Sequence, residues 1–150
     1  MKNHVFSLLL MVICLAAKSQ LSNEQEKLYN QVLETSQKRY LALIQGNHKE
    51  IDVFFDDSVI MIASHLNQKL NLNQLKNSLV QKKLLYDTLY NLNVNPHFYN
   101  NNKMCILTGE RQIVYKKPKM EVKIAFSEVF YLNDKNQWKM VYYHSNKVEK

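Results

Sequence analysis

The carboxyl-terminal segment, residues 123–148, constrains the fold most strongly because its pattern is that of a long β-hairpin. Two runs rich in aromatic and β-branched residues flank a polar turn at residues 133–136. Alternate residues of a strand share one face. The two predicted inner faces are Ile124, Phe126, Glu128 and Phe130, then Trp138, Met140, Tyr142 and His144. A polar or ionisable residue interrupts each apolar face, which predicts a sheet wrapped around a pocket rather than a fully dry core.

Residues 1–19 read as a secretory signal peptide. A basic start with Lys2 precedes an apolar run over residues 5–17, and Ala17 and Ser19 mark a small-x-small cleavage site. The run is too short to span a bilayer comfortably. We therefore expect an exported protein, periplasmic or extracellular, with no stable membrane anchor after cleavage. Residues 20–150 have the length of a single domain.

The positive charge of the chain does not indicate a nucleic-acid site. Loss of Lys2 and Lys18 with the signal peptide, and of no acidic residue, lowers the formal net charge from +7 to +5. Only Arg39 and Arg111 are arginines, and most lysines are scattered among acidic residues. Nucleic-acid surfaces cluster their cations and use arginine forks, so we expect no nucleic-acid partner.

Hydrophobic spacing predicts three helices in the first half of the chain. The first begins at Ser22 or Asn23, where Asn23 and Glu26 can form a capping box, and ends near Gly46. A short second helix covers residues 48–55.

The third predicted helix begins at Asn71, which can form a capping box with Gln74. Its apolar stripe continues to Val80, and its last turn is expected to contain Lys82 and Lys83, where cations suit the helix dipole.

The strands are predicted mainly behind these helices. A short buried strand at residues 58–63 follows a turn at residues 56–57, and a loop or small hairpin covers residues 65–70. A half-exposed strand at residues 86–94 is closed by Pro96, and a long strand at residues 103–115 leads into the terminal hairpin. This order predicts an α+β fold with helices on one face of a mostly antiparallel sheet.

The order of elements and four short motifs resemble the nuclear transport factor 2-like superfamily, in its SnoaL-like and ketosteroid-isomerase-like branch. The motifs lie at residues 51–59, 107–109, 126–130 and 138–145, and the resemblance covers about residues 24–147. It implies a cone-shaped roll, in which a strongly curved sheet wraps around the three helices and leaves a cavity at the wide end. It also implies that the outer sheet face forms a homodimer.

The resemblance transfers catalytic positions only in part. Steroid isomerases use a tyrosine of the first helix in an oxyanion hole, and Tyr40 resembles it. Their proton-shuttling carboxylate falls, by counting along the first strand, at Ile62, and isoleucine moves no proton. Many relatives have an arginine near Ala125, where alanine holds no carboxylate or phosphate.

Glu128 and His144 are the candidate catalytic residues. If both strands turn these faces inward, the two side chains are cross-strand neighbours. Burial would then raise the pKa of Glu128, and histidine exchanges protons near neutral pH. The competing interpretations are a Glu128 that faces water or a partner or pairs with Lys or His, and a His144 that only holds the strand edge.

A ligand entering the cone is expected to meet polar groups from several elements. The candidate ligand-binding residues are Tyr40, His65, Glu110, Glu128, Tyr142 and His144. For the tyrosines the alternative is a core ring with its hydroxyl at a polar rim, and for Glu110 it is a solvated face.

The sequence indicates neither a metal nor a cofactor. The histidines lack ligand spacing, and phosphate-binding glycine loops are missing. Cys105, the single cysteine beyond residue 19, sits in an apolar run and is expected to be an inert core residue.

Three functions remain open. The first is an exported binding module for a small, partly apolar molecule, without chemistry. The second is an isomerase, dehydratase or hydrolase that uses the Glu128–His144 pair. The third is a structural or interaction module that forms a homodimer through the outer sheet face. The residues expected on that face are Tyr115, Val129, Tyr131, Val141 and Tyr143.

Overall fold

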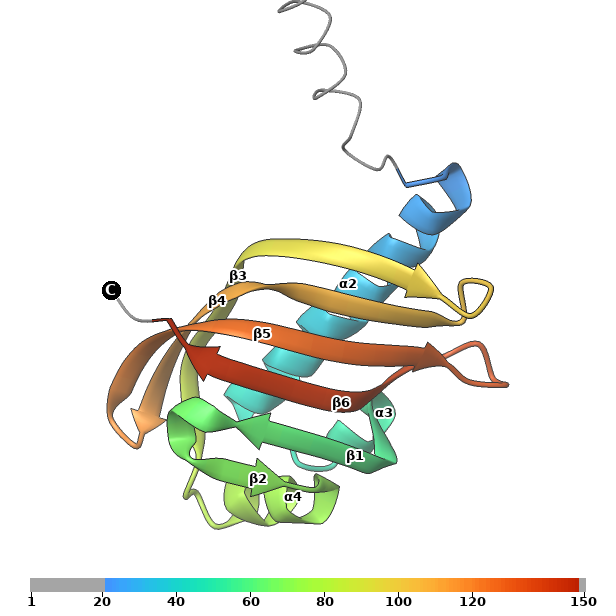
Figure 1. The fold of residues 1–150 in the computed structure, drawn as a ribbon. Coiled ribbons are helices and arrows are strands. Elements are labelled where there is room, and N and C mark those ends of the chain that lie inside the picture. The colour runs from blue at the N-terminus through green and yellow to red at the C-terminus, as the bar shows by residue number, and fades with distance from the viewer. Residues whose placement is uncertain (1–20, 149–150) are drawn as a thin grey trace, which may run out of the picture.

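The computed structural model describes residues 21–148, so the predicted signal peptide lies outside the described residues. A curved six-stranded sheet wraps around one long helix, α2 (Figure 1). The elements in chain order are α2 (Asn23–Gln45), α3 (Ile51–Phe54), β1 (Phe55–Ala63), the short 3₁₀ helix η1 (Ser64–Leu66), β2 (Gln68–Leu70), α4 (Leu72–Val80), β3 (Leu85–Tyr99), β4 (Met104–Lys117), β5 (Met120–Leu132) and β6 (Trp138–Lys147).

The strand order is β2-β1-β6-β5-β4-β3. All neighbours are antiparallel except β1 and β6, which run parallel. The α+β class and the curved, mostly antiparallel sheet are therefore confirmed. The sheet is open, because β2 and β3 form its two edges.

The capping box of helix α2 lies one residue earlier than expected. The capping box joins Ser22 and Gln25, not Asn23 and Glu26. The helix ends as predicted at Gly46, whose φ of 66° is the left-handed conformation that glycine adopts at little cost.

The segment between α2 and β3 differs from the prediction at its boundaries. Helix α3 is a single turn, and β1 already begins at Phe55, so residues 56–57 belong to the strand. Helix α4 has the predicted capping box of Asn71 and Gln74 but ends at Val80. Lys82 and Lys83 therefore lie beyond its last turn, and Lys82 has a left-handed φ of 51°.

Strand β3 continues through Pro96 to Tyr99, although the proline was expected to close it. Proline lacks the N–H through which a residue donates a hydrogen bond to a neighbouring strand, so prolines are found mainly in edge strands. Strand β3 is an edge of the sheet and pairs with β4 alone, where Pro96 lies opposite Leu107. No strand on the other side of β3 therefore needs a hydrogen bond from Pro96.

Strand β6 contains an irregularity that reverses its faces. Val129 pairs with Tyr142 and Phe130 with Met140, which leaves Val141 as an extra residue on β6. A β-bulge of this kind shifts all following side chains to the opposite face. Trp138 and Met140 are buried as predicted, but beyond the bulge the buried residue is Ser145 rather than His144.

Gly109 of β4 has no room for a side chain. A Cβ at this position would lie 2.2 Å from the backbone oxygen of Asn93, where β3 shifts register against β4. Gly109→Ala must push the two strands apart, and we expect it to lower the free energy of unfolding by about 1–3 kcal/mol. Urea denaturation measures the loss. Thr108→Ala, on the outer face of the same strand, is the control, and an equal effect of both substitutions would contradict this interpretation.

Candidate functional site

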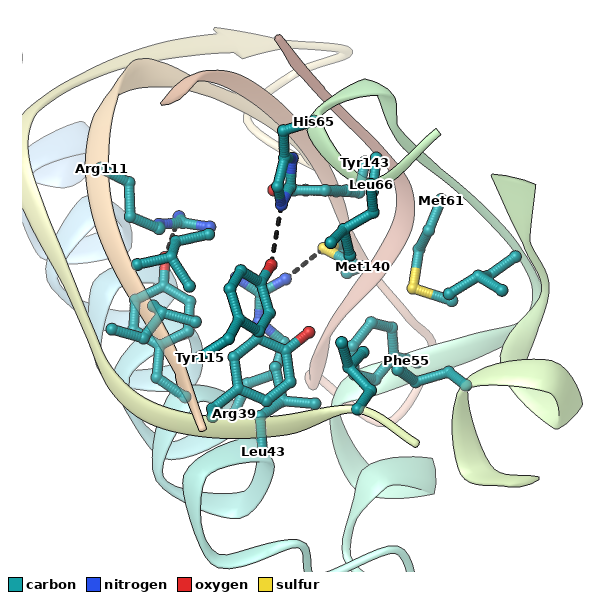
Figure 2. A pocket seen from close by; sticks show the side chains of 18 residues that line it. Arg39, Leu43, Phe55, Met61, His65, Leu66, Arg111, Tyr115, Met140 and Tyr143 are labelled. Atoms are coloured by element: carbon teal, nitrogen blue, oxygen red, sulfur yellow. Dashed lines mark hydrogen bonds between the residues drawn. The ribbon is translucent and has the colours of Figure 1, made fainter. Parts of the chain in front are cut away.

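A cavity of about 50 Å³ lies between α2, the η1–β2 segment, α4 and the inner face of the sheet. This volume holds roughly three or four water molecules. Figure 2 shows the side chains that line it. They are Arg39, Tyr40, Leu43, Phe55, Met61, Ala63, His65, Leu66, Leu70, Leu75, Leu84, Tyr86, Leu89, Arg111, Ile113, Tyr115, Met140 and Tyr143.

Two arginines on the cavity wall bind one buried carboxylate behind it. Arg39 of α2 and Arg111 of β4 donate to the same oxygen, Oε1 of Glu128 on β5, from 2.6 Å and 2.9 Å. Ser36, one helical turn before Arg39, contributes its hydroxyl to the other oxygen at 3.5 Å. All four side chains are at most 3% exposed. This cluster joins the helix to two strands of the sheet.

The guanidinium of Arg111 has further partners. The Nε of Arg111 donates to Asn91 Oδ1 at 2.8 Å, and another of its nitrogens donates to the Tyr40 hydroxyl. Arg111 also lies over the Phe126 ring, with its central carbon 3.9 Å from the ring centroid. Such cation–π contacts favour a guanidinium in a partly apolar site.

The ion pairs decide the charge state of the buried cluster. Burial alone would raise the pKa of Glu128, but the charges of Arg111 and Arg39 outweigh burial and lower it. Burial opposes the charge of Arg111, but Glu128 more than compensates and raises the pKa of this guanidinium. Glu128 therefore stays ionised, and the expected rise of its pKa was wrong because two cations face it.

His65 joins two walls of the cavity. Its Nδ1 lies 3.0 Å from Ser145 Oγ on β6, and its Nε2 lies 2.7 Å from the Tyr115 hydroxyl on β4. The second contact is visible in Figure 2. Burial lowers the pKa of His65 to about 4, so the imidazole is neutral at pH 7. The neutral ring is held in place by both nitrogens.

The structure separates the predicted site residues into two groups. Tyr40 and His65 line the cavity, and Glu128 lies directly behind its arginines. Glu110 instead points away from the core and pairs with Lys123 at 2.9 Å. The roles proposed for Tyr40 and His65 as ligand contacts stay predictions.

The predicted Glu128–His144 pair does not form. Glu128 lies opposite Tyr143, and His144 lies opposite Ser127, because the bulge at Val141 turns His144 and Tyr142 to the outer face. For the same reason Tyr143 lines the cavity rather than the outer face.

One other expected placement was wrong, and one carried-over position lies outside the cavity. Tyr115 was expected on the outer face but is 3% exposed and lines the cavity. Ile62, the position carried over for the catalytic carboxylate, alternates with the inward residues Met61 and Ala63 and does not line the cavity. A homodimer through the outer face stays a prediction.

Sequence reasoning missed Arg39 and Arg111 as site residues. The available signal was that they are the two arginines of the chain. Arg39 also falls between Ser36 and Leu43 on the buried stripe of α2, and Arg111 alternates with inward residues of β4. A lone arginine on each buried face indicates an internal partner.

Within residues 21–148, no three His, Cys, Asp or Glu side chains gather where they could hold a metal ion. Over the same range, no helix is both long and apolar enough to cross a membrane. Cys105 is fully buried, and burial raises its thiol pKa to about 12, as expected for an inert core residue.

Comparison with known proteins identifies the fold. No protein-family model and no curated protein matches the sequence. An NTF2-like protein from Cytophaga hutchinsonii is 12% identical and superposes with a TM-score of 0.69, over 78% of this chain and 95% of that one. The S. rosetta CaMKII hub is 15% identical, with a TM-score of 0.64 over 79% and 95%. A proposed ketosteroid isomerase from Parabacteroides distasonis is 21% identical, with a TM-score of 0.58 over 79% and 86%.

The stability of the fold is expected to depend on the buried carboxylate of Glu128. Glu128→Gln leaves Arg39 and Arg111 facing each other without an anion, and we expect it to lower the free energy of unfolding by about 3–5 kcal/mol. Chemical denaturation measures this loss. Glu110→Gln, which breaks the exposed pair with Lys123, is the matched control and should cost much less. Similar losses would mean that the buried cluster does not hold the helix on the sheet.

The stability of the protein is expected to depend on pH through His65. The unfolded chain protonates His65 near pH 6.5, whereas the folded protein keeps it neutral down to about pH 4. Between these values the unfolded chain binds more protons, so stability falls as pH falls. With allowance for partial exposure, we expect a loss of about 1 kcal/mol between pH 7 and pH 5.

Denaturation at a series of pH values gives the slope of the free energy of unfolding against pH. We expect His65→Gln to flatten this slope between pH 7 and pH 5. His97→Gln, on the exposed edge strand, is the control and should leave the slope unchanged. An unaltered slope in His65→Gln would contradict the assignment.

Proposed function

We propose that this chain, which has the nuclear transport factor 2-like fold, is an exported binding protein that takes a small, partly apolar molecule into the cavity of its cone. The observation that carries the proposal is the composition of the cavity wall. Aliphatic and aromatic side chains form most of it, and a few polar groups converge from different elements. Ligand sites in proteins have this character.

The polar groups at the cavity are already positioned without a ligand. Arg39 and Arg111 are fixed by Glu128, and His65 is fixed by Ser145 and Tyr115. Preformed sites lose little conformational entropy on binding. The cavity volume favours a ligand, or a ligand end, of only a few non-hydrogen atoms.

Binding is favoured over catalysis by the state of the acid and base candidates. Glu128 is ionised and lies behind two arginines, away from the cavity lining. Both nitrogens of His65 are engaged, and its low pKa makes it a weak base. A general base must reach the proton that it removes, and neither group meets this need as placed.

Native mass spectrometry of the protein purified from its own cells tests the proposal. We expect an additional mass that denaturation releases. Ala63→Leu fills the cavity from β1 and should abolish the additional mass. Ile62→Leu, the adjacent outward residue, is the control and should retain it.

A thermal-shift panel of alcohols, amides and carboxylates of two to six carbons complements this experiment. Ligands that bind only the folded state raise its melting temperature. If no mass co-purifies and no compound shifts the wild-type protein more than Ala63→Leu, the binding proposal is wrong.

A further inference from the structure

We propose that the ligand is a small monocarboxylate with a short apolar tail, and that its carboxylate binds Arg39 at the position now taken by the Met140 thioether. This inference rests on the proposed binding function and adds the chemical class of the ligand.

The buried cluster of Arg39, Arg111 and Glu128 has more positive than negative charge. Among the described residues, the buried charged side chains are Arg39, Arg111 and Glu128. Two guanidinium groups pair with one carboxylate, so the cluster has a net charge of one positive unit, and this charge is buried. A buried charge without a counter-ion is costly. One monoanion in the adjacent cavity would neutralise it.

Arg39 has hydrogen-bond donors that no strong acceptor satisfies. Its Nη2 donates to Glu128 and Ser36, but its Nη1 contacts only the sulfur of Met140, and its Nε has no acceptor among the described residues. A thioether is a weak acceptor. Buried donors of a charged group normally have strong acceptors. Arg39 therefore has unused capacity for an anionic oxygen.

Met140 lies at the cavity wall, and its flexible side chain can move away from Arg39. Both Met140 and Arg39 line the cavity, and Figure 2 shows the contact between them at its wall. Methionine has flexible torsions and adapts to new neighbours. A carboxylate entering the cavity can thus replace the sulfur as the acceptor for Arg39 without moving the ion pairs behind it.

Arg111 does not compete for the same role. Its Nε already donates to Asn91, and its other nitrogens donate to Glu128 and to the Tyr40 hydroxyl. The surrounding rings and aliphatic chains leave an apolar wall for the tail of the ligand. His65 is neutral at pH 7 and adds no second positive charge, which favours a monoanion over a dianion such as phosphate.

Calorimetric titration with propionate, propionamide and inorganic phosphate at pH 7 tests the charge requirement. Propionate and propionamide have the same size and differ in charge. We expect propionate to bind at least about tenfold more tightly than propionamide, the usual gain from a charge-assisted hydrogen bond. Phosphate should bind more weakly than propionate, because it has no apolar tail. Phosphate binding as tight as that of propionate would overturn the assignment to a monocarboxylate.

The NMR signals of the arginine Nε–H groups report the position directly. The chain has two arginines, so each can be assigned by its loss in one variant. Propionate should shift the Arg39 signal and propionamide should not. Arg111 Nε, already bonded to Asn91, is the internal control and should move less. A shift of Arg111 alone would overturn the placement.

Substitutions in α2 test whether the preference for propionate depends on Arg39 itself or on positive charge in general. Arg39→Met leaves Glu128 and Arg111 as a one-to-one pair and should reduce the preference for propionate over propionamide to about onefold. Arg39→Lys keeps the charge and should retain part of the preference. Lys38→Met removes a neighbouring exposed cation and should change nothing. If Arg39→Met does not fold, the NMR titration of the wild-type protein decides.

The outcomes distinguish this inference from the proposed function. Equal binding of propionate and propionamide would overturn the inference and leave the binding function standing. If the cavity binds neither these probes nor any compound of the thermal-shift panel, both proposals fail.

Discussion

The ion pairs from Arg39 and Arg111 to Glu128 are the interaction on which the rest of the structure depends. One carboxylate oxygen accepts from a residue of α2 and from a residue of β4, while the carboxylate itself belongs to β5. Apolar packing is not directional, so it would tolerate a helix that slides or rotates against the sheet. The charged hydrogen bonds fix one position along the helix and one register, and they do so next to the cavity.

The cluster also determines what kind of chemistry the cavity offers. An isolated buried carboxylate would hold a proton near neutral pH and could serve as an acid. Two guanidinium groups keep Glu128 ionised and place positive charge on the cavity wall. The interior therefore presents hydrogen-bond donors rather than an exchangeable proton, in keeping with the binding function that we propose.

Much of the fold was predictable because it depends on local signals. The left-handed Gly46, the Asn71–Gln74 capping box and the turn at residues 133–136 are each fixed by residues close in sequence. The inward face of β5 was equally clear from its alternation. These features sufficed for the α+β class and for the resemblance that the solved structures confirm at the level of the fold.

The site was less predictable because its decisive features are not local. The bulge at Val141 leaves no mark in the sequence, since both alternating sets of β6 contain aromatic residues and either could face inward. The partner of Glu128 on α2 lies 89 residues away, and an ion pair at that separation follows from tertiary packing alone. The end of β3 was wrongly predicted at Pro96 for a related reason. A strand can continue through this proline because β3 is an edge of the sheet, which depends on tertiary structure.

The parallel pairing of β1 with β6 has a consequence for how the chain matures. Ile60 of β1 pairs with Tyr142 of β6, so β1 gains this neighbour only after β6 has been synthesised. Until β6 is inserted, β1 and β5 each have an open edge where another chain could add. The sheet cannot be completed until β6 has been synthesised, and long-range pairing of this kind forms slowly. Assembly of the cone therefore depends on the arrival of β6, which joins β1 to β5.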